Sequence, residues 1–408
     1  MPGSGAASPR VVLFTDTLAD VNGVSRFIRA AAAHLPNLHV ITSTRLGCPL
    51  AENVHNVRPV FRAPMPGYAN IDLAIPSPGA IRAAADRARP DVVHVSTPGP
   101  VGLIGRRYAM RRGLPLVGTY HTDFPAYIDH LLDDELLTRL TGAYMRWFYR
   151  PFDRVLARSR AFVPALRELG IRAGSVADLR PGMDTGAFHP RFRDALGEIW
   201  RTLPGARPSS RKLLYAGRVS TEKNLPMLAR IWPRIRAGCE RRGIDAQLVI
   251  VGDGPFRGAL ERTLARQDAV FAGFRDGAAL SAIYASSDVF VFPSATDTLG
   301  QAVMEAHASG LPAIVSDRGG PSGIVEHERT GYVLPLPPIT NAESLWCERA
   351  VALLGSPELR DRMGASARER LDAMTIGASL EHFLELHGGL AGAKNKPGHA
   401  LARGPARR

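Results

Sequence analysis

The sequence predicts an α/β protein of two doubly wound domains, each built on a parallel sheet, that face each other across a cleft. Short runs rich in Val, Leu and Ile alternate with segments of helical periodicity, as expected for buried parallel strands joined by helices. The scheme occurs twice, on either side of a Pro- and Ser-containing stretch at 204–210. With 408 residues and 45% hydrophobic side chains, the chain can bury a core in each domain.

The first half is expected to contain seven strands, and residues 1–184 are predicted to form the first domain. Helical periodicity over 24–35, 79–87 and 102–112 supplies connections between strands. The predicted strands are 11–16, 39–43, 54–58, 92–97, 114–121, 154–159 and 176–180.

The second half repeats the scheme over residues 211–375, after a linker region at 185–210. A helical pattern runs from about 341 to 386, and its last part, 376–390, is expected to pack back toward the first domain. Residues 391–408 are expected to form a disordered basic tail. The predicted strands are 212–218, 247–252, 269–273, 289–293, 313–317 and 331–334.

The composition argues against several other classes of protein. No window approaches the 18 consecutive apolar residues of a membrane-spanning helix. The first ten residues lack the apolar segment of a secretory signal, and the three cysteines lie far apart without metal-binding spacing. We therefore expect a cytoplasmic location, with peripheral contact to the inner face of a membrane as an option.

The net charge of +13 is unevenly distributed. Residues 1–184 hold 22 basic and 15 acidic side chains, and residues 394–408 hold five basic and no acidic ones. Such an excess favours anionic partners, although it also favours solubility alone. The segment 136–150 combines an apolar face with Arg139, Arg146 and Arg150, which fits either a core helix with solvated arginines or docking on an anionic bilayer. Nucleic acid is not an expected partner, because it explains the charge but none of the loops.

One strand end in the second half carries two cations, Arg218 and Lys223. The chain has only four lysines, so a lysine in the folded part stands out among the arginines. A guanidinium fork and an ammonium point charge at one strand end suit a diphosphate, and would stabilise a departing phosphate. The alternative is a solvated loop in which Lys223 pairs with Glu222.

A later strand end carries two carboxylates, Asp297 and Glu305, around the start of a helix. Asp297 is predicted to precede the helix and Glu305 to lie two turns inside it. Backbone N–H groups near Gly300 and Gln301 would face an anionic ligand at the positive end of the helix. A carboxylate inside this helix could accept hydrogen bonds from ribose or sugar hydroxyls. The alternative is a plain capping box, Thr298-x-x-Gln301.

The strand ends of the first half give weaker signals. His121 follows a strand and could donate to a sugar hydroxyl or shuttle a proton, although a lone His is more often structural. Gly23, in the first strand-to-helix turn, permits close approach of a ligand. The glycines at 251–255 lack the third glycine of a dinucleotide fingerprint, which disfavours a nicotinamide site.

Taken together, these loops resemble the retaining glycosyltransferases of family 4. The motifs are GRVSTEKN at 217–224, VGDGP at 251–255 and FPSATDTLGQAVMEAHASGLPAIVSDRGG at 292–320, supported by HTDFP at 121–125 and RPGMDTGAFHP at 180–190. The resemblance covers about residues 10–390. HTDFP together with TDTxG looks most similar to a lipid-acting branch, the bacterial glycolipid mannosyltransferases and the sulfoquinovosyl diacylglycerol synthases.

The resemblance implies the GT-B fold and a nucleotide-sugar donor held mainly by the second domain. Arg218 and Lys223 would bind the donor diphosphate, and Glu305 would contact the ribose. Asp297 stands where the family usually has Glu, which puts the usual contact with the donor sugar in question. The remaining positions implied for the donor are His121 facing the sugar, Gly23 at the phosphates, Phe274 near the base, and Gly300 and Gln301 at the helix start.

The implied reaction is transfer with retention to a lipid or glycan acceptor, giving an α-linkage. No enzymic nucleophile is evident, which fits a front-face substitution in which the leaving phosphate helps to deprotonate the acceptor. No Asp-x-Asp motif occurs, and we expect neither a metal nor another cofactor.

The subfamily resemblance favours GDP-mannose as the donor, with a UDP-sugar as the alternative. Two other possibilities on the same fold are a nucleotide-sugar epimerase and a non-catalytic protein that binds sugar nucleotides, for which Asp297 is the main support. A pyridoxal-dependent phosphorylase is disfavoured, because only Lys212 and Lys223 are available for a Schiff base in the folded part.

Overall fold

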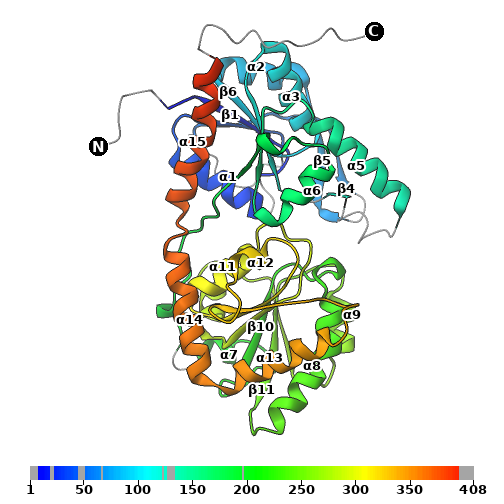
Figure 1. Ribbon diagram of the computed structural model, residues 1–408, viewed down its shortest axis with the longest axis vertical. Helices are drawn as coiled ribbons and strands as arrows, with labels where there is room; N and C mark the ends of the chain where they lie inside the picture. The colour runs from blue at the N-terminus through cyan, green and yellow to red at the C-terminus, as the bar shows by residue number, and fades with distance from the viewer. Residues whose placement is uncertain are drawn as a thin grey trace.

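The computed structural model describes residues 8–18, 23–44, 51–65, 68–121, 124–125, 134–194 and 197–394. Within these residues the chain forms two α/β domains, drawn one above the other in Figure 1, each with a parallel sheet and flanking helices. Segments of both domains line a pocket where they meet. The predicted fold class of two doubly wound domains facing across a cleft is confirmed.

The sheet of the first domain has seven strands in the order β3-β2-β1-β6-β7-β8-β9, and all its pairings are parallel. Every strand predicted in the first half is present in it. The strand order reverses between β1 and β6, so the crevice at their carboxyl ends is a topological switch point. The strands are β1 (Val11–Thr15), β2 (Leu38–Thr42), β3 (Val54–Asn56), β6 (Val92–Val95), β7 (Leu116–Tyr120), β8 (Arg154–Ala157) and β9 (Val176–Asp178).

A hairpin of β4 (Pro59–Met65) and β5 (Tyr68–Pro76) extends from this domain and was not predicted. Its strands pair antiparallel, and prolines interrupt the alternation of polar and apolar residues that would reveal them. The helices of the domain are α1 (Gly23–His34), α2 (Pro78–Ala88), α3 (Pro100–Arg112), α5 (Glu135–Tyr149) and α6 (Val163–Glu168).

The sheet of the second domain has six parallel strands in the order β12-β11-β10-β13-β14-β15. Its order reverses between β10 and β13, which makes a second switch point. The strands are β10 (Arg211–Ala216), β11 (Ala246–Val251), β12 (Ala269–Gly273), β13 (Val289–Phe292), β14 (Ala313–Ser316) and β15 (Gly331–Leu334). The helices up to β15 are α8 (Leu225–Glu240), α9 (Arg257–Thr263), α10 (Gly277–Ser286), α11 (Gln301–Ala308) and α12 (Pro321–Ile324).

The residues predicted as a linker pack onto the second domain. Trp200, in α7 (Glu198–Arg201), is buried in its core. Arg207 forms ion pairs with Asp245 and Asp268, at 2.6 and 2.8 Å. The ammonium of Lys212 donates to the carbonyl oxygen of Arg207 at 2.5 Å. Polar contacts thus fix a stretch whose composition resembles a flexible linker, and the boundaries at 184 and 210 remain predictions.

The long C-terminal helical pattern divides into three helices, α13 (Ala342–Gly355), α14 (Pro357–Asp372) and α15 (Ile376–Lys394). Figure 1 shows α14 and α15 running along one side of the molecule from the second domain to the first. Leu380 and Phe383 of α15 are buried in the core of the first domain. Because α15 extends to Lys394, residues 391–394 are helical and not part of a disordered tail; 395–408 lie outside the described residues.

Candidate active site

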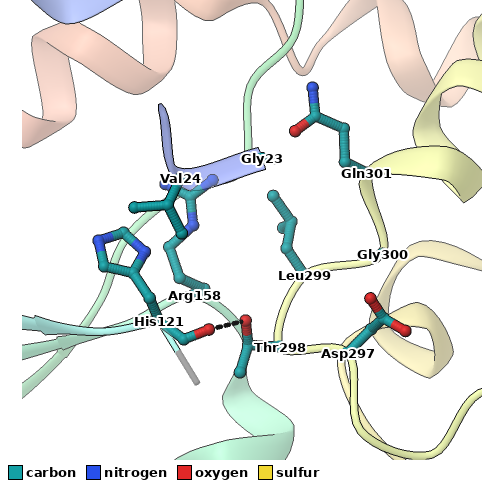
Figure 2. Close-up of a pocket in the computed structure, with 9 residues that line it drawn as sticks. All are labelled: Gly23, Val24, His121, Arg158, Asp297, Thr298, Leu299, Gly300 and Gln301. Carbon is teal, nitrogen blue, oxygen red and sulfur yellow. Dashed lines mark hydrogen bonds between the residues drawn. The ribbon is translucent and has the colours of Figure 1, made fainter. Parts of the chain in front are cut away.

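The candidate site is a pocket of about 180 Å³ between the two domains (Figure 2). It lies at the carboxyl ends of strands from both sheets, as expected for open α/β sheets. Its volume is below the ~300 Å³ at the lower end of small-ligand pockets, so it accommodates only part of a nucleotide sugar. The residues that line it are Gly23, Val24, His121, Arg158, Asp297, Thr298, Leu299, Gly300 and Gln301.

The start of α11 forms the second-domain wall of the pocket. Gly300 precedes it with a φ of 85°, and an added Cβ would lie 2.9 Å from Cγ of Pro321, so this position requires glycine. The alternative interpretation as a capping box is wrong, because no side-chain hydrogen bond caps α11 and Thr298 donates instead to the carbonyl oxygen of His121, at 2.5 Å. Among the described residues, no side chain therefore caps the first N–H groups of α11 at the edge of the pocket.

Lys223 and Asp297 lie together beside this wall. Nζ of Lys223 is 2.8 Å from Oδ2 of Asp297, and both side chains are largely buried. The alternative pairing with Glu222 is not seen, because Glu222 instead accepts a hydrogen bond from Ser220 at 2.6 Å. A diphosphate bound to Lys223 would therefore compete with Asp297 for the ammonium group.

Glu305 lies about one turn inside α11 and not two as predicted, because the helix starts at Gln301. Its side chain is buried and accepts two hydrogen bonds, from the Tyr284 hydroxyl at 3.0 Å and from Arg26 at 2.6 Å. Burial raises the pKa of Glu305, and Arg26 and Tyr284 oppose this rise. Arg26 belongs to α1, so this ion pair joins the two domains.

His121 follows β7 on the first-domain wall. One of its ring nitrogens, Nε2, lies 2.9 Å from the hydroxyl oxygen of Ser96, which orients the ring. Burial lowers the pKa of His121 well below its usual value, and the charge of Arg158 lowers it further. The imidazole is therefore neutral at pH 7. Thr122 and Asp123, the next residues of the predicted motif, lie outside the described residues.

Gly23, at the start of α1, lies against the second domain. A Cβ added to it would lie 2.7 Å from the side-chain oxygen of Gln301. The absence of a side chain thus lets α1 approach the start of α11, and the pocket is narrow here.

Four predicted site residues, Arg218, Lys223, Phe274 and Glu305, do not themselves line the pocket. Lys223 pairs with Asp297 of the lining, and Glu305 belongs to α11. Arg218 is exposed on the loop after β10, and Phe274 follows β12 with 51% of its surface exposed. Both stand at carboxyl ends of strands of the second sheet. A ligand longer than the pocket could extend toward them, and their roles remain predictions.

Sequence reasoning missed two arginines, Arg26 and Arg158. Arg26 and its partner Glu305 are 279 residues apart in the sequence, so no local pattern indicates the pair. Arg158 directly follows β8, and its position at a strand end was an available signal that the abundance of arginines concealed. Figure 2 shows Arg158 beside His121 and Val24.

Neither a metal cluster nor a membrane span is found within the described ranges. No three or more His, Cys, Asp or Glu side chains there are grouped so that they could hold a metal ion. None of the helices described is both long and apolar enough to cross a bilayer.

Comparison with known proteins gives matches over most of the chain. Residues 21–187 match the family described as Glycosyltransferase Family 4, and residues 210–348 match Glycosyl transferases group 1. A GDP-mannose-dependent alpha-mannosyltransferase of Mycolicibacterium smegmatis is 33% identical, over 90% of this chain and 93% of its own length. The sulfoquinovosyl transferase SQD2 of Arabidopsis thaliana is 28% identical, over 91% and 72%. Among solved structures, Anabaena HepE in complex with UDP and glucose has a TM-score of 0.72 at 15% identity, and the match covers 94% of this chain and all of that one.

Proposed function

The chain belongs to glycosyltransferase family 4, and from this premise we propose that it transfers mannose from GDP-mannose to a lipid acceptor at a membrane surface. As a member of the family it is a retaining hexosyltransferase that uses a nucleotide-sugar donor. The single observation that carries the donor site is the pairing of Lys223 with Asp297 at the start of α11, with Glu305 one turn behind. Mannose is favoured because relatives named as GDP-mannose-dependent match this chain at 33% and 34% identity.

The second domain would hold the nucleotide. Lys223 would bind the diphosphate together with Arg218. The first N–H groups of α11, at the positive end of the helix dipole, would donate further hydrogen bonds to it. Glu305 would accept hydrogen bonds from the ribose hydroxyls, since its carboxylate retains lone pairs beside Tyr284 and Arg26. Phe274, exposed beyond the pocket, would stack on the base.

The chemical step would take place on one face of the sugar. The bond between the anomeric carbon and the diphosphate oxygen breaks, and the acceptor oxygen bonds to the same face of that carbon. The acceptor proton passes to the departing phosphate, whose charge Lys223 and the start of α11 stabilise. Neutral His121, oriented by Ser96, would hold a hydroxyl of the sugar.

The first domain has a surface suited to an anionic membrane. Large apolar side chains are exposed on its hairpin and on α3 and α5, and a groove between α2 and α3 carries five arginines against one carboxylate, Asp86. Trp147 borders the groove, under the guanidinium of Arg106 at 4.3 Å. Cations beside apolar side chains match the headgroups and acyl chains of an anionic bilayer. The apolar side chains are Val60, Phe61, Ile75, Met110, Leu136, Leu137, Leu140 and Trp147.

A donor that carries sulfoquinovose is the second candidate. It is supported by the relative named sulfoquinovosyl transferase, which matches 91% of this chain. The two candidates differ in charge, because the sulfonate of sulfoquinovose is an anion whereas mannose is neutral.

Calorimetric titration with GDP and UDP tests the donor site. We expect GDP to bind the wild type, and Lys223→Ala to weaken binding by about 1.5–3 kcal/mol, as for a charged hydrogen bond. Arg230→Ala is the matched control, since Arg230 is an exposed cation on α8 that pairs with Glu343. Binding of UDP alone would replace GDP-mannose with a UDP-sugar, and binding of neither nucleotide would overturn the donor site.

Liposome sedimentation tests the acceptor side. The wild type should sediment with vesicles that contain phosphatidylglycerol and less so with pure phosphatidylcholine or at high salt. Leu136→Ser combined with Leu140→Ser should weaken sedimentation, whereas Arg160→Ala, outside this surface, should not. Binding that ignores both lipid charge and salt would contradict the membrane proposal.

A further inference from the structure

Arg158 is a buried cation for which no ion pair or hydrogen bond is found among the described residues. Only 4% of its surface is exposed, and its Nη1 is buried without a hydrogen bond. Its guanidinium lies over the ring of Phe27, with the guanidinium carbon 4.5 Å from the ring centroid. Its side chain also lines the pocket between the domains (Figure 2).

Arg360, the second buried arginine among the described residues, shows how a structural arginine is held in this protein. It is 7% exposed, donates to the carbonyl oxygens of Leu353 and Leu354 at 2.8 Å each, and lies 3.6 Å from Asp288. Buried charges are ordinarily paired in this way. Arg158 lacks such partners in the described part of the chain, so packing of the fold does not account for it.

The charge of Arg158 persists at neutral pH. Burial lowers its pKa to about 10, which leaves the guanidinium protonated. Of the described carboxylates at the site, Asp297 pairs with Lys223 and Glu305 pairs with Arg26. The first-domain wall of the pocket therefore presents a desolvated positive charge.

We propose that Arg158 forms an oxyanion subsite in this pocket, which takes a carboxylate, sulfonate or phosphate group of the bound substrates. A guanidinium can donate two parallel hydrogen bonds to such a group, and the bonds are strong where water is excluded. The subsite is separate from Lys223, which pairs with Asp297 of the opposite wall. The identity of the substrates rests on the proposed function, whereas the presence of an anion subsite does not.

The first experiment compares the melting temperatures of variants of the full chain. Replacing an unpaired buried charge with an apolar side chain of similar length should stabilise the fold, so Arg158→Met should melt about 2 °C or more above the wild type. Arg160→Met is the matched control, because Arg160 is exposed and pairs with Asp178. A lower melting temperature for Arg158→Met alone would assign Arg158 a structural role and overturn the proposal.

The second experiment uses sodium sulfate as the probe, with sodium chloride at equal ionic strength as the reference. Sulfate stabilises most proteins by exclusion from their surface, and it could also bind elsewhere in the cleft. The informative quantity is therefore the difference between variants. Sulfate should raise the melting temperature of the wild type more than that of Arg158→Met, and the rise for Arg158→Lys should lie between the two. Equal gains in all three would overturn the proposal, whether or not any nucleotide binds.

The third experiment identifies the source of the anion. Affinities of wild type and Arg158→Met are compared for GDP, UDP, UDP-glucose and UDP-glucuronate, and the Michaelis constant for an acceptor is compared with and without a phosphate in its headgroup. A loss of about tenfold to a hundredfold is expected for the ligand that supplies the oxyanion. Weaker binding of every nucleotide would identify the diphosphate as the source of the oxyanion. Weaker binding of UDP-glucuronate alone would identify the donor sugar, and an effect on the phosphorylated acceptor alone would identify the acceptor. No loss for any ligand would overturn the proposal.

Discussion

The two walls of the pocket differ in how their charges are balanced. On the second-domain wall, Lys223 pairs with Asp297, and the carboxylate of Glu305 is held by Arg26 and Tyr284. On the first-domain wall, Arg158 has no carboxylate or hydrogen-bond partner among the described residues. A ligand that binds the second wall must compete with existing pairs, whereas one that binds the first wall supplies a missing counter-charge.

The largest effect is expected at Lys223, where the second wall meets the departing phosphate. Lys223→Met should lower the rate of transfer about 10²–10³-fold, because a donor aimed at developing charge is lost. It also leaves Asp297 without its partner, so the double variant with Asp297→Asn separates the two effects. We expect the double variant to regain melting temperature but not transfer, measured as release of GDP from GDP-mannose with acceptor. Recovery of transfer would mean that Lys223 only neutralises Asp297.

Arg26 tests whether the second wall depends on the first domain. In Arg26→Gln, Glu305 loses the cation that opposes its raised pKa, so this pKa rises further. The charged carboxylate should then be lost at a higher pH, and donor affinity should fall by about tenfold or more as the pH drops from about 8 to 5.5. Arg26→Lys should restore much of the affinity, and Arg29→Gln, on the exposed face of α1, should match the wild type. A flat pH profile in Arg26→Gln would show that Arg26 does not govern the charge of Glu305.

Helix α15 contacts the sheet of the first domain through two buried histidines, His94 and His387. Nδ1 of His94 on β6 lies 2.9 Å from Nε2 of His387, and Nε2 of His94 lies 3.0 Å from the hydroxyl of Thr119. Burial lowers the pKa of both histidines, that of His387 to about 4. The charges of His387 and His121 lower the pKa of His94 further, and the charge of Arg154 lowers the pKa of His387. His387 also contacts the carbonyl oxygen of Phe383.

Acid should therefore loosen α15 before it affects the second domain. A histidine with a lowered pKa binds fewer protons in the folded than in the unfolded chain, so its contribution is complete above about pH 6.5 and is lost as the pH falls toward 4. Hydrogen exchange at about pH 7.5 and 5, corrected for intrinsic rates, should show larger loss of protection in α15 than in α13. His387→Phe should reduce this difference. Equal loss in both helices would argue against the histidine pair as the acid-sensitive element.

The same contrast between the walls explains what sequence could predict. The second wall comes from two contiguous stretches, 217–224 and 292–320, so spacing along the chain indicated Lys223, Asp297 and Glu305 together. The alternation of strands and helices likewise predicted both parallel sheets, because buried strands form apolar runs. Arg26 and Arg158 belong to separate segments whose meeting depends on tertiary folding. The hairpin of β4 and β5 was missed because its prolines obscure the alternation.

The smallest expected effect distinguishes two glycines that face each other across the pocket. At Gly300 the left-handed backbone and a contact of 2.9 Å with Pro321 both oppose a side chain, so Gly300→Ala should cost about 1–3 kcal/mol of stability and weaken donor binding. At Gly23 the obstacle is the end of the flexible Gln301 side chain, 2.7 Å away. Gly23→Ala should therefore cost less than about 1 kcal/mol in urea unfolding, and Gln301→Ala should relieve it. Equal costs for the two glycines would mean that the first wall is as rigid as the second, and that the narrow approach of α1 to α11 is fixed by backbone and not by Gln301.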